Sequence, residues 1–148
     1  MRIAVLNGPN LNLLGTREPA IYGRETLADI EARLRAVGRE LGVELTFAQE
    51  NAEGALIDRV QALRGTADGA IVNAGAYSHS SLALRDAFTA VEVPFVEVHV
   101  SNVYAREPER RHSMLAPAAR AVLCGFGAEG YELALRGLVA MLAPAARA

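Results

Sequence analysis

A glutamate and a histidine share one face of a short apolar segment. Residues 95–102 read "FVEVHVSN", in which Glu97 and His99 alternate with valines. A strand that is covered on both faces is almost continuously apolar, and burying an ionisable pair in it costs free energy unless hydrogen bonds or a ligand compensate. We therefore expect Glu97 to orient His99 for proton transfer. A purely structural hydrogen bond and a metal site are the alternatives.

More polar side chains follow another apolar segment, in "VNAGAYSHSS" at residues 72–81. A helix N-cap accounts for Ser80 or Ser81 but not for Asn73 or His79. We expect Asn73 and His79 to bind a small ligand, and the free backbone N–H groups at a helix start favour a carboxylate or phosphate. His79 could also join the glutamate–histidine pair in a metal site, although the sequence shows no tight ligand spacing.

The stretch "NGPNLNLLGTREPAIYG" at residues 7–23 is too long for a simple turn. Strand-to-helix connections usually take about two to six residues. Arg17 and Tyr22 are the side chains in it that a turn does not require. A nearby cation favours the phenolate form of a tyrosine, which can remove a proton. We expect Tyr22 to be a base supported by Arg17, with an ordinary surface lid as the alternative.

Arginines crowd the stretch "YAREPERRHSM" at residues 104–114. Arg106, Arg110 and Arg111 lie close to the end of the apolar segment that carries the glutamate–histidine pair. An arginine there would clamp a carboxylate through paired hydrogen bonds. A solvated run of charge is the alternative.

Composition excludes several mechanisms. The chain has 148 residues, a net charge of −2 and 15 basic residues, all of them arginine. Without lysine there is no Schiff base, no pyridoxal phosphate attachment and no Walker A site. The balanced charge shows no footprint for nucleic acid or a membrane surface. The lone Cys124 permits no internal disulfide, so we expect a cytoplasmic protein with a small-molecule partner.

Short apolar runs alternate with helical periodicity along the whole chain. This order predicts one α/β domain over residues 1–148, with a flavodoxin-like, doubly wound parallel sheet of strand order 2-1-3-4-5, helices on both faces and a lid loop at about residues 8–24. In such sheets, ligands bind beyond the carboxyl ends of the strands. Strands are predicted at 2–7, 43–49, 69–75, 94–102 and 120–126, and helices near 27–41, 56–63, 80–92 and 131–142.

The candidate residues together favour an elimination reaction. A base and an acid without a nucleophile, metal or cofactor suit proton abstraction followed by loss of a hydroxyl group. A flavodoxin-like module that binds FMN or phosphate is the alternative from another class. The motif "GFGAEG" at residues 125–130 matches the dinucleotide fingerprint, but it opens the last helix, so we expect a tight turn instead.

The sequence closely resembles the type II 3-dehydroquinate dehydratases. The resemblance rests on "LNGPNLNLLGTREPAIYG", "EGALID", "NAGAYSHSSLALRDA", "EVHVSN" and "GFGAEGYELAL", in this order across nearly the whole chain. It implies the removal of water from 3-dehydroquinate to give 3-dehydroshikimate, through an enolate and with no cofactor, in the shikimate or quinate pathway.

The resemblance also implies roles for individual residues. Tyr22 would take the proton beside the ketone, with support from Arg17, and His99, oriented by Glu97, would protonate the departing hydroxyl. Asn10 would hold a water that stabilises the enolate. The substrate would be bound by Asn73, His79, Arg110 and the backbone of Val100 and Ser101.

The family's assembly is a dodecamer built from trimers, in which Asp86 of a neighbouring subunit would complete the site. The chain departs from the family's usual residues at Glu50, Ala74, Pro108 and Glu109. The last two directly precede Arg110.

Overall fold

The structure, a computed structural model, describes residues 1–144. Within this range the strands form a parallel sheet of order β2-β1-β3-β4-β5, which confirms the predicted flavodoxin-like winding. Residues 145–148 of the predicted domain lie outside the described part. The strands are β1 (Arg2–Asn7), β2 (Glu44–Gln49), β3 (Gly69–Asn73), β4 (Phe95–His99) and β5 (Ala121–Cys124).

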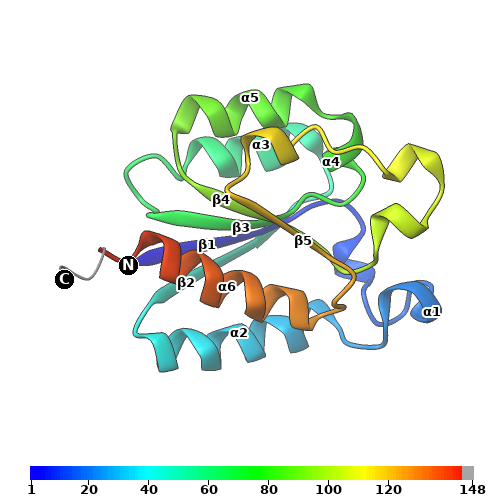
Figure 1. Cartoon of the computed structure of the whole chain (residues 1–148), viewed down its shortest axis with the longest axis horizontal. Coiled ribbons are helices and arrows are strands. Elements are labelled where there is room, and N and C mark those ends of the chain that lie inside the picture. The colour runs from blue at the N-terminus through cyan, green and yellow to red at the C-terminus, as the bar shows by residue number, and fades with distance from the viewer. Residues whose placement is uncertain (145–148) are drawn as a thin grey trace.

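Helices cover both faces of the sheet (Figure 1). The α-helices are α1 (Pro19–Tyr22), α2 (Leu27–Leu41), α3 (Glu53–Gln61), α4 (Tyr77–Ser80), α5 (Leu82–Val91) and α6 (Glu129–Leu142). α2 and α6 pack on one face, and α3 and α5 on the other. Side chains alternate between the faces of a strand, so Ile3 and Val5 enter the first core and Ala4 and Leu6 the second. Across residues 1–144, no helix has the length and apolar character needed to cross a membrane.

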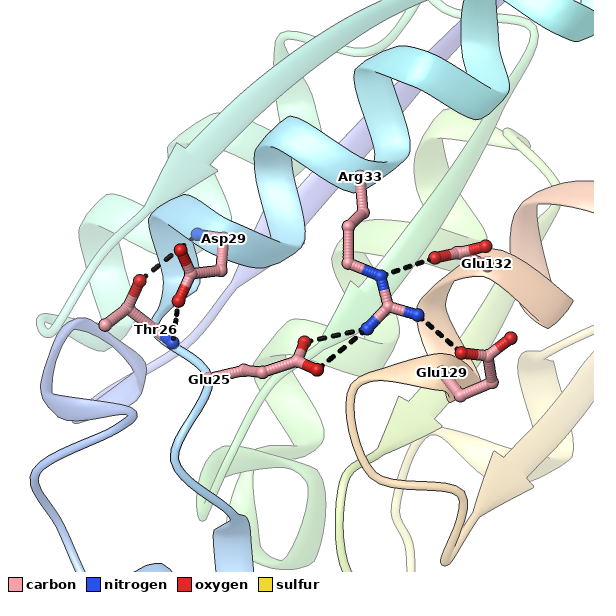
Figure 2. Close-up of polar contacts among 6 residues, drawn as sticks. All are labelled: Glu25, Thr26, Asp29, Arg33, Glu129 and Glu132. Carbon is pink, nitrogen blue, oxygen red and sulfur yellow. Dashed lines mark hydrogen bonds and ion pairs between the residues drawn. The ribbon is translucent and has the colours of Figure 1, made fainter.

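α2 begins and ends where the sequence predicts. The Asp29 backbone N–H donates to Thr26 Oγ1 at 3.1 Å, and the Thr26 N–H donates to Asp29 Oδ2 at 2.9 Å (Figure 2). This capping box satisfies two backbone donors that a helix start leaves open. Gly42 ends the helix at φ 68°, a conformation that glycine adopts without strain. The helix therefore starts directly after the long loop that carries Tyr22.

The helix predicted near residues 80–92 is α5, and a separate single turn, α4, precedes it. Ser81 adopts an extended conformation between α4 and α5, and its Oγ accepts the Leu84 N–H at 2.9 Å. Ser81 is therefore the N-cap of α5, one of the two serines predicted for that role. The preceding single turn, α4, contains His79.

The opening loop (residues 8–24) is compact. It contains the 3₁₀ turn η1 (Leu11–Leu13) and α1, and Leu11 and Leu14 anchor it in the core. A Cβ at Gly8 would lie 2.3 Å from the carbonyl oxygen of Ala74. Only glycine therefore lets the loop after β1 pass so close to the loop after β3. This close passage lies where the strand order reverses.

Irregular segments complete the end of the sheet at which the site lies. The 3₁₀ turns η2 (Val103–Ala105), η3 (Pro108–Arg110) and η4 (Ala116–Ala118) connect β4 to β5. After β5, Gly125 and Gly127 have φ values of 89° and 61°, which confirms the tight turn predicted for "GFGAEG". The Gly127 N–H donates to the Val100 carbonyl oxygen at 3.0 Å and so holds the chain just beyond β4.

Candidate active site

A cavity of about 150 Å³ opens at the carboxyl ends of β1, β3 and β4. This is the crevice that the strand order predicts for a ligand. Every predicted site residue lines the cavity except Glu97, which lies behind His99, and Asp86. The predicted residues at the cavity are Asn10, Arg17, Tyr22, Asn73, His79, His99, Val100, Ser101 and Arg110.

Glu97 and His99 form the buried wall of the site. His99 Nε2 lies 2.6 Å from Glu97 Oε1, and Glu97 is completely shielded from solvent. Their contact confirms the predicted pairing of the two side chains on one face of the strand. A carboxylate in contact with one ring nitrogen orients the imidazole, so the pair has the parts of a proton-transfer group beside the cavity.

A second histidine stacks against this pair. The rings of His79 and His99 have centroids 5.7 Å apart, and His79 Nδ1 lies 2.8 Å from the carbonyl oxygen of His112. A carbonyl can only accept, so Nδ1 carries the hydrogen and Nε2 is left as an acceptor. Burial lowers the pKa of His79. His79 is therefore suited to accept a hydrogen bond as a neutral ring.

Tyr22 forms the opposite wall, at the end of α1. Arg106 Nη1 donates to the Tyr22 hydroxyl oxygen at 2.7 Å and lies 3.4 Å from Ser101 Oγ. The Arg17 guanidinium carbon lies 4.9 Å from the centre of the Tyr22 ring, over its face. Two cations therefore surround the phenol, and the one that contacts its oxygen stabilises a negative charge there most directly.

Arg106 is the site residue whose role the sequence analysis missed. The arginine-rich run predicts that Arg106 binds a carboxylate. The sequence names Arg17 as the one cation that supports Tyr22. The contact joins the end of α1 to the irregular stretch after β4, 84 residues away in the chain. No periodicity or motif spacing reports such a pairing, so only the shape of the crevice reveals it.

Asn73 is held in one orientation by a buried network. Its side-chain amide donates to the Tyr131 hydroxyl oxygen at 2.9 Å, and its Oδ1 accepts the Gly75 N–H at 3.2 Å. The Tyr131 hydroxyl in turn donates to Asn7 Oδ1. Burial raises the pKa of Tyr131, so this phenol stays neutral. The network fixes which face of the Asn73 amide meets the cavity.

Asn10 and Arg110 border the cavity from its more exposed sides. Asn10 has a left-handed backbone, φ 67°, and its N–H donates to Asn51 Oδ1 at 3.0 Å. Arg110 Nε donates to Glu107 Oε1 at 2.6 Å. Pro108 starts the turn η3 that ends at Arg110. The departures from the family pattern in this turn thus leave the Arg110 side chain at the cavity.

A cluster of charged residues ties the end of the opening loop to two helices (Figure 2). Arg33 on α2 donates from Nη1 to both carboxylate oxygens of Glu25, at 2.9 and 2.8 Å. The same guanidinium contacts Glu132 at 2.7 Å and Glu129 at 2.5 Å, both on α6. Glu25 follows Tyr22 closely in the chain, so this Arg33 cluster fixes the exit of the loop that carries Tyr22.

Asp86 lies apart from the cavity. It is exposed on α5, next to Arg85, which lines an open groove of about 530 Å³ on that side of the molecule. The groove is larger than the cavity at the strand ends, but none of the predicted site residues, Asp86 included, lines it. Within one chain, Asp86 therefore does not join the site.

The two walls of the cavity define a class of protein. The cavity is lined by a tyrosine whose oxygen contacts a guanidinium and by a histidine that contacts a carboxylate. Such a pair of side chains can remove one proton and supply another. Among residues 1–144, no group of three or more His, Cys, Asp or Glu side chains is placed to hold a metal ion. The fold and site are those of a flavodoxin-like acid–base enzyme.

Comparison with known proteins identifies the family. Residues 1–139 match the model of the family described as Dehydroquinase class II. The chain is 67% identical to the 3-dehydroquinate dehydratase of Gemmatimonas aurantiaca over 142 residues, covering 96% of this chain and 93% of that relative. It is 60% identical to the enzyme of the same name from Methylococcus capsulatus over 140 residues, covering 94% of this chain and 95% of the relative.

Solved structures agree with this result. The type II dehydroquinase from Propionibacterium acnes superimposes with a TM-score of 0.90 at 40% identity, over 94% of this chain and 96% of that one. The corresponding structure from Butyrivibrio crossotus gives 0.91 at 40% identity, over 93% and 97%. The chain belongs to the class II dehydroquinase family. It is a hydro-lyase that dehydrates 3-dehydroquinate, a reaction whose standard context is the shikimate pathway.

Proposed function

We propose that Tyr22 removes the proton and His99 supplies one in the dehydration of 3-dehydroquinate. One observation carries this proposal: Tyr22 and His99 line the same cavity, and each contacts a charged side chain. Arg106 lies 2.7 Å from the Tyr22 oxygen on one side, and Glu97 lies 2.6 Å from His99 on the other. The cavity is lined by both Tyr22 and His99.

The first step breaks a carbon–hydrogen bond beside the ketone. The Tyr22 phenolate takes the proton, and the electron pair moves onto the ketone oxygen to give an enolate. The Arg106 guanidinium stabilises the phenolate before the transfer, and Arg17 adds positive charge over the ring. Asn10, at the cavity edge, holds a water that donates to the enolate oxygen.

The second step breaks the carbon–oxygen bond of the departing hydroxyl. The enolate collapses to the conjugated ketone while protonated His99 gives its proton to the hydroxyl, which leaves as water. Glu97 stabilises the imidazolium before the transfer and orients the ring. Tyr22 gains one proton and His99 loses one, so the net number of protons on the enzyme is unchanged. Exchange with solvent then removes the proton from Tyr22 and restores the one on His99.

The remaining predicted residues bind the substrate. We assign the hydroxyl groups to Asn73 and His79, whose orientations are fixed by Tyr131 and by the His112 carbonyl. Arg110 binds a further hydroxyl, and the carboxylate meets the backbone of Val100 and Ser101. The opening loop (residues 8–24) acts as a lid over this site, and the whole chain forms one catalytic domain.

An ultraviolet assay tests the assignment of the base. Dehydration conjugates a new double bond with the ketone and carboxylate, so absorbance rises as product forms. We expect Tyr22→Phe to lose nearly all of this rise while its circular dichroism stays unchanged. The matched control is Tyr104→Phe, because Tyr104 is 61% exposed and lies outside the cavity. A Tyr22→Phe protein that turns over at the native rate would show that Tyr22 is not the base.

We also propose that the enzyme assembles as a dodecamer of trimers, with Asp86 completing the site of a neighbouring subunit. Support comes from the exposure of Asp86 on α5, away from the cavity of its own chain. Mixing tests this directly. Tyr22→Phe and Asp86→Ala subunits, each weakly active alone, should regain activity after joint dissociation and reassembly. Hybrid interfaces then pair an intact Tyr22 with an intact Asp86. No gain in activity would exclude a role across the interface.

A cytoplasmic location is the remaining part of the proposal. Its support is the free thiol of Cys124, which needs no oxidising compartment. Fractionation of the source cells, with the dehydratase activity as the marker, checks it. Activity in an extracytoplasmic fraction would contradict it.

A further inference from the structure

A serine outside the predicted site residues contacts the acid pair. Ser113 lies between η3 and η4, and its Oγ is 2.6 Å from Glu97 Oε1, the same oxygen that contacts His99. Ser113 does not line the cavity, so it cannot touch the substrate. It reaches the reaction only through Glu97.

The direction of this hydrogen bond follows from the other partners of Ser113. Its Oγ accepts the backbone N–H of Leu115 at 3.1 Å and that of Ala116 at 3.0 Å. A hydroxyl group has two lone pairs and one hydrogen. Both lone pairs are committed to these backbone donors, so the hydrogen is free to be donated, and Glu97 Oε1 is its acceptor.

The direction of the Ser113 hydrogen bond bears on the hydrogen bond between Glu97 and His99. Glu97 Oε1 accepts from Ser113, and the other carboxylate oxygen, Oε2, is buried with no hydrogen-bond partner in the described part of the chain. In its carboxylate form Glu97 has no hydrogen to give and can only accept. His99 Nε2 must then be the donor in its contact with Oε1, which leaves Nδ1 as the ring nitrogen that can exchange a proton with a ligand.

We propose that Ser113 is a positioning residue for the acid. Its hydroxyl holds Glu97 as an acceptor, and Glu97 thereby holds His99 in the tautomer with hydrogen on Nε2 and directs Nδ1 to the departing hydroxyl. This inference rests on the proposed role of His99. The contacts run from the backbone N–H groups of Leu115 and Ala116 to Ser113, then to Glu97 and finally to the His99 ring.

Kinetics of Ser113→Ala provide the first test. A hydrogen bond to a charged group contributes about 1.5–3 kcal/mol, so kcat should fall by about 10-fold to 100-fold. KM should change by less than about twofold, because Ser113 makes no contact with the cavity. Ser113→Thr keeps a hydroxyl group and should recover most of the rate. An unchanged kcat in folded Ser113→Ala would overturn the proposal.

The chain offers a closely matched control in Ser81. Its Oγ also accepts a backbone N–H, from Leu84 at 2.9 Å, and donates to a carboxylate, that of Glu53. Ser81→Ala therefore removes the same kinds of contact, with one backbone donor fewer, at a place away from the acid pair. It should lower thermal stability about as much as Ser113→Ala does while leaving kcat near the native value. Equal losses of kcat in both variants would show that the effect is structural.

A spectroscopic test needs no activity. The chain has 3 histidines, so ¹⁵N solid-state NMR of histidine-labelled protein can be assigned with His79→Gln and His112→Gln. In the native protein, neutral His99 should show hydrogen on Nε2 alone. In Ser113→Ala the two tautomers should mix, and in Ser81→Ala they should not. Hydrogen on Nδ1 in the native protein would overturn the proposal. Failure of the proposed acid role would appear separately, as full activity in His99→Asn.

Discussion

The two walls of the active site are held by different forces. β4, which carries Glu97 and His99, is buried along its whole length, and its polar pair is fixed by short contacts away from solvent. The opening loop, which carries Arg17 and Tyr22, is mostly exposed. Two buried leucines, one guanidinium on the tyrosine oxygen and the Arg33 cluster hold it in place. The proposed acid thus belongs to the rigid sheet, whereas the proposed base belongs to a segment with few packing contacts.

This difference has a physical consequence for function. Regions with few buried contacts open at a lower free-energy cost than core strands, and exposed ion pairs weaken as salt rises. We therefore expect substrate entry to involve the opening loop, while β4 keeps the proposed acid in place. Substitutions that loosen the loop should alter both KM and kcat, whereas substitutions behind His99 should alter kcat alone.

After the loss of Tyr22 itself, the largest effect on the loop side of the cavity is expected from Arg106→Leu. Without the guanidinium on its oxygen, the Tyr22 phenolate loses its direct hydrogen bond, and kcat should fall by about 100-fold or more. Steady-state kinetics measure this loss, with Arg64→Leu in the exposed turn after α3 as the control. If Arg106→Leu kept the native kcat, the contact between Arg106 and Tyr22 would have no part in the reaction.

A smaller effect is expected from Glu25→Gln, which detaches the loop exit from Arg33. Exposed ion pairs contribute about 0.2–1 kcal/mol each, and Glu25 makes two contacts to one guanidinium. Trypsin cleavage after Arg17 and Arg24 should become about threefold to tenfold faster, and kcat/KM should fall by a similar factor.

Glu40→Gln provides the matched control for this loss. Glu40 accepts two contacts from Arg136, both at 2.8 Å, and this pair links the same two helices, α2 and α6, without touching the loop. The Glu40→Gln protein should be cleaved at the native rate after Arg17 and Arg24. Equal cleavage rates in the two variants would mean that the Arg33 cluster does not restrain the loop.

Tyr131→Phe should have the smallest effect on catalysis and a distinctive dependence on pH. Burial raises the pKa of Tyr131 above its usual 10.0. Above about pH 10 the unfolded chain loses a proton that the folded chain keeps, so the free energy of unfolding falls as pH rises, by up to about 1.4 kcal/mol per pH unit. The stabilising contribution of this phenol is therefore complete below about pH 10 and is lost above it.

Urea unfolding at two pH values measures this dependence. Near pH 8, Tyr131→Phe should be less stable than the native protein by about 1 kcal/mol, since Asn7 and Asn73 lose a hydrogen-bond partner. Near pH 11 the free energies of unfolding of the two proteins should become more alike, because the variant has no phenol at this position whose ionisation lowers its stability at high pH. A gap that stays constant across this range would show that Tyr131 ionises equally in both states.

The sequence predicts the fold and the strand-end residues because both follow local rules. Apolar runs identify the strands, and the capping box at Thr26 identifies the start of α2. An ionisable pair in an apolar strand marks Glu97 and His99. In contrast, the contacts of Arg106 with Tyr22 and of Ser113 with Glu97 reach from the irregular stretch after β4 to other elements. Tyr131 resembles any apolar residue in a helix stripe. Their roles depend on tertiary distances that no spacing in the chain encodes.

Hydrogen exchange of the substrate tests most directly whether Tyr22 removes the proton and His99 supplies one. In D₂O, ¹H NMR follows loss of the hydrogen beside the ketone of 3-dehydroquinate, and an enzyme-free sample gives the background rate. In His99→Asn, Tyr22 still removes the proton, so we predict exchange above background with little product. Tyr22→Phe should show neither exchange nor product. Exchange at the native rate in Tyr22→Phe would contradict the assignment of the base to the loop.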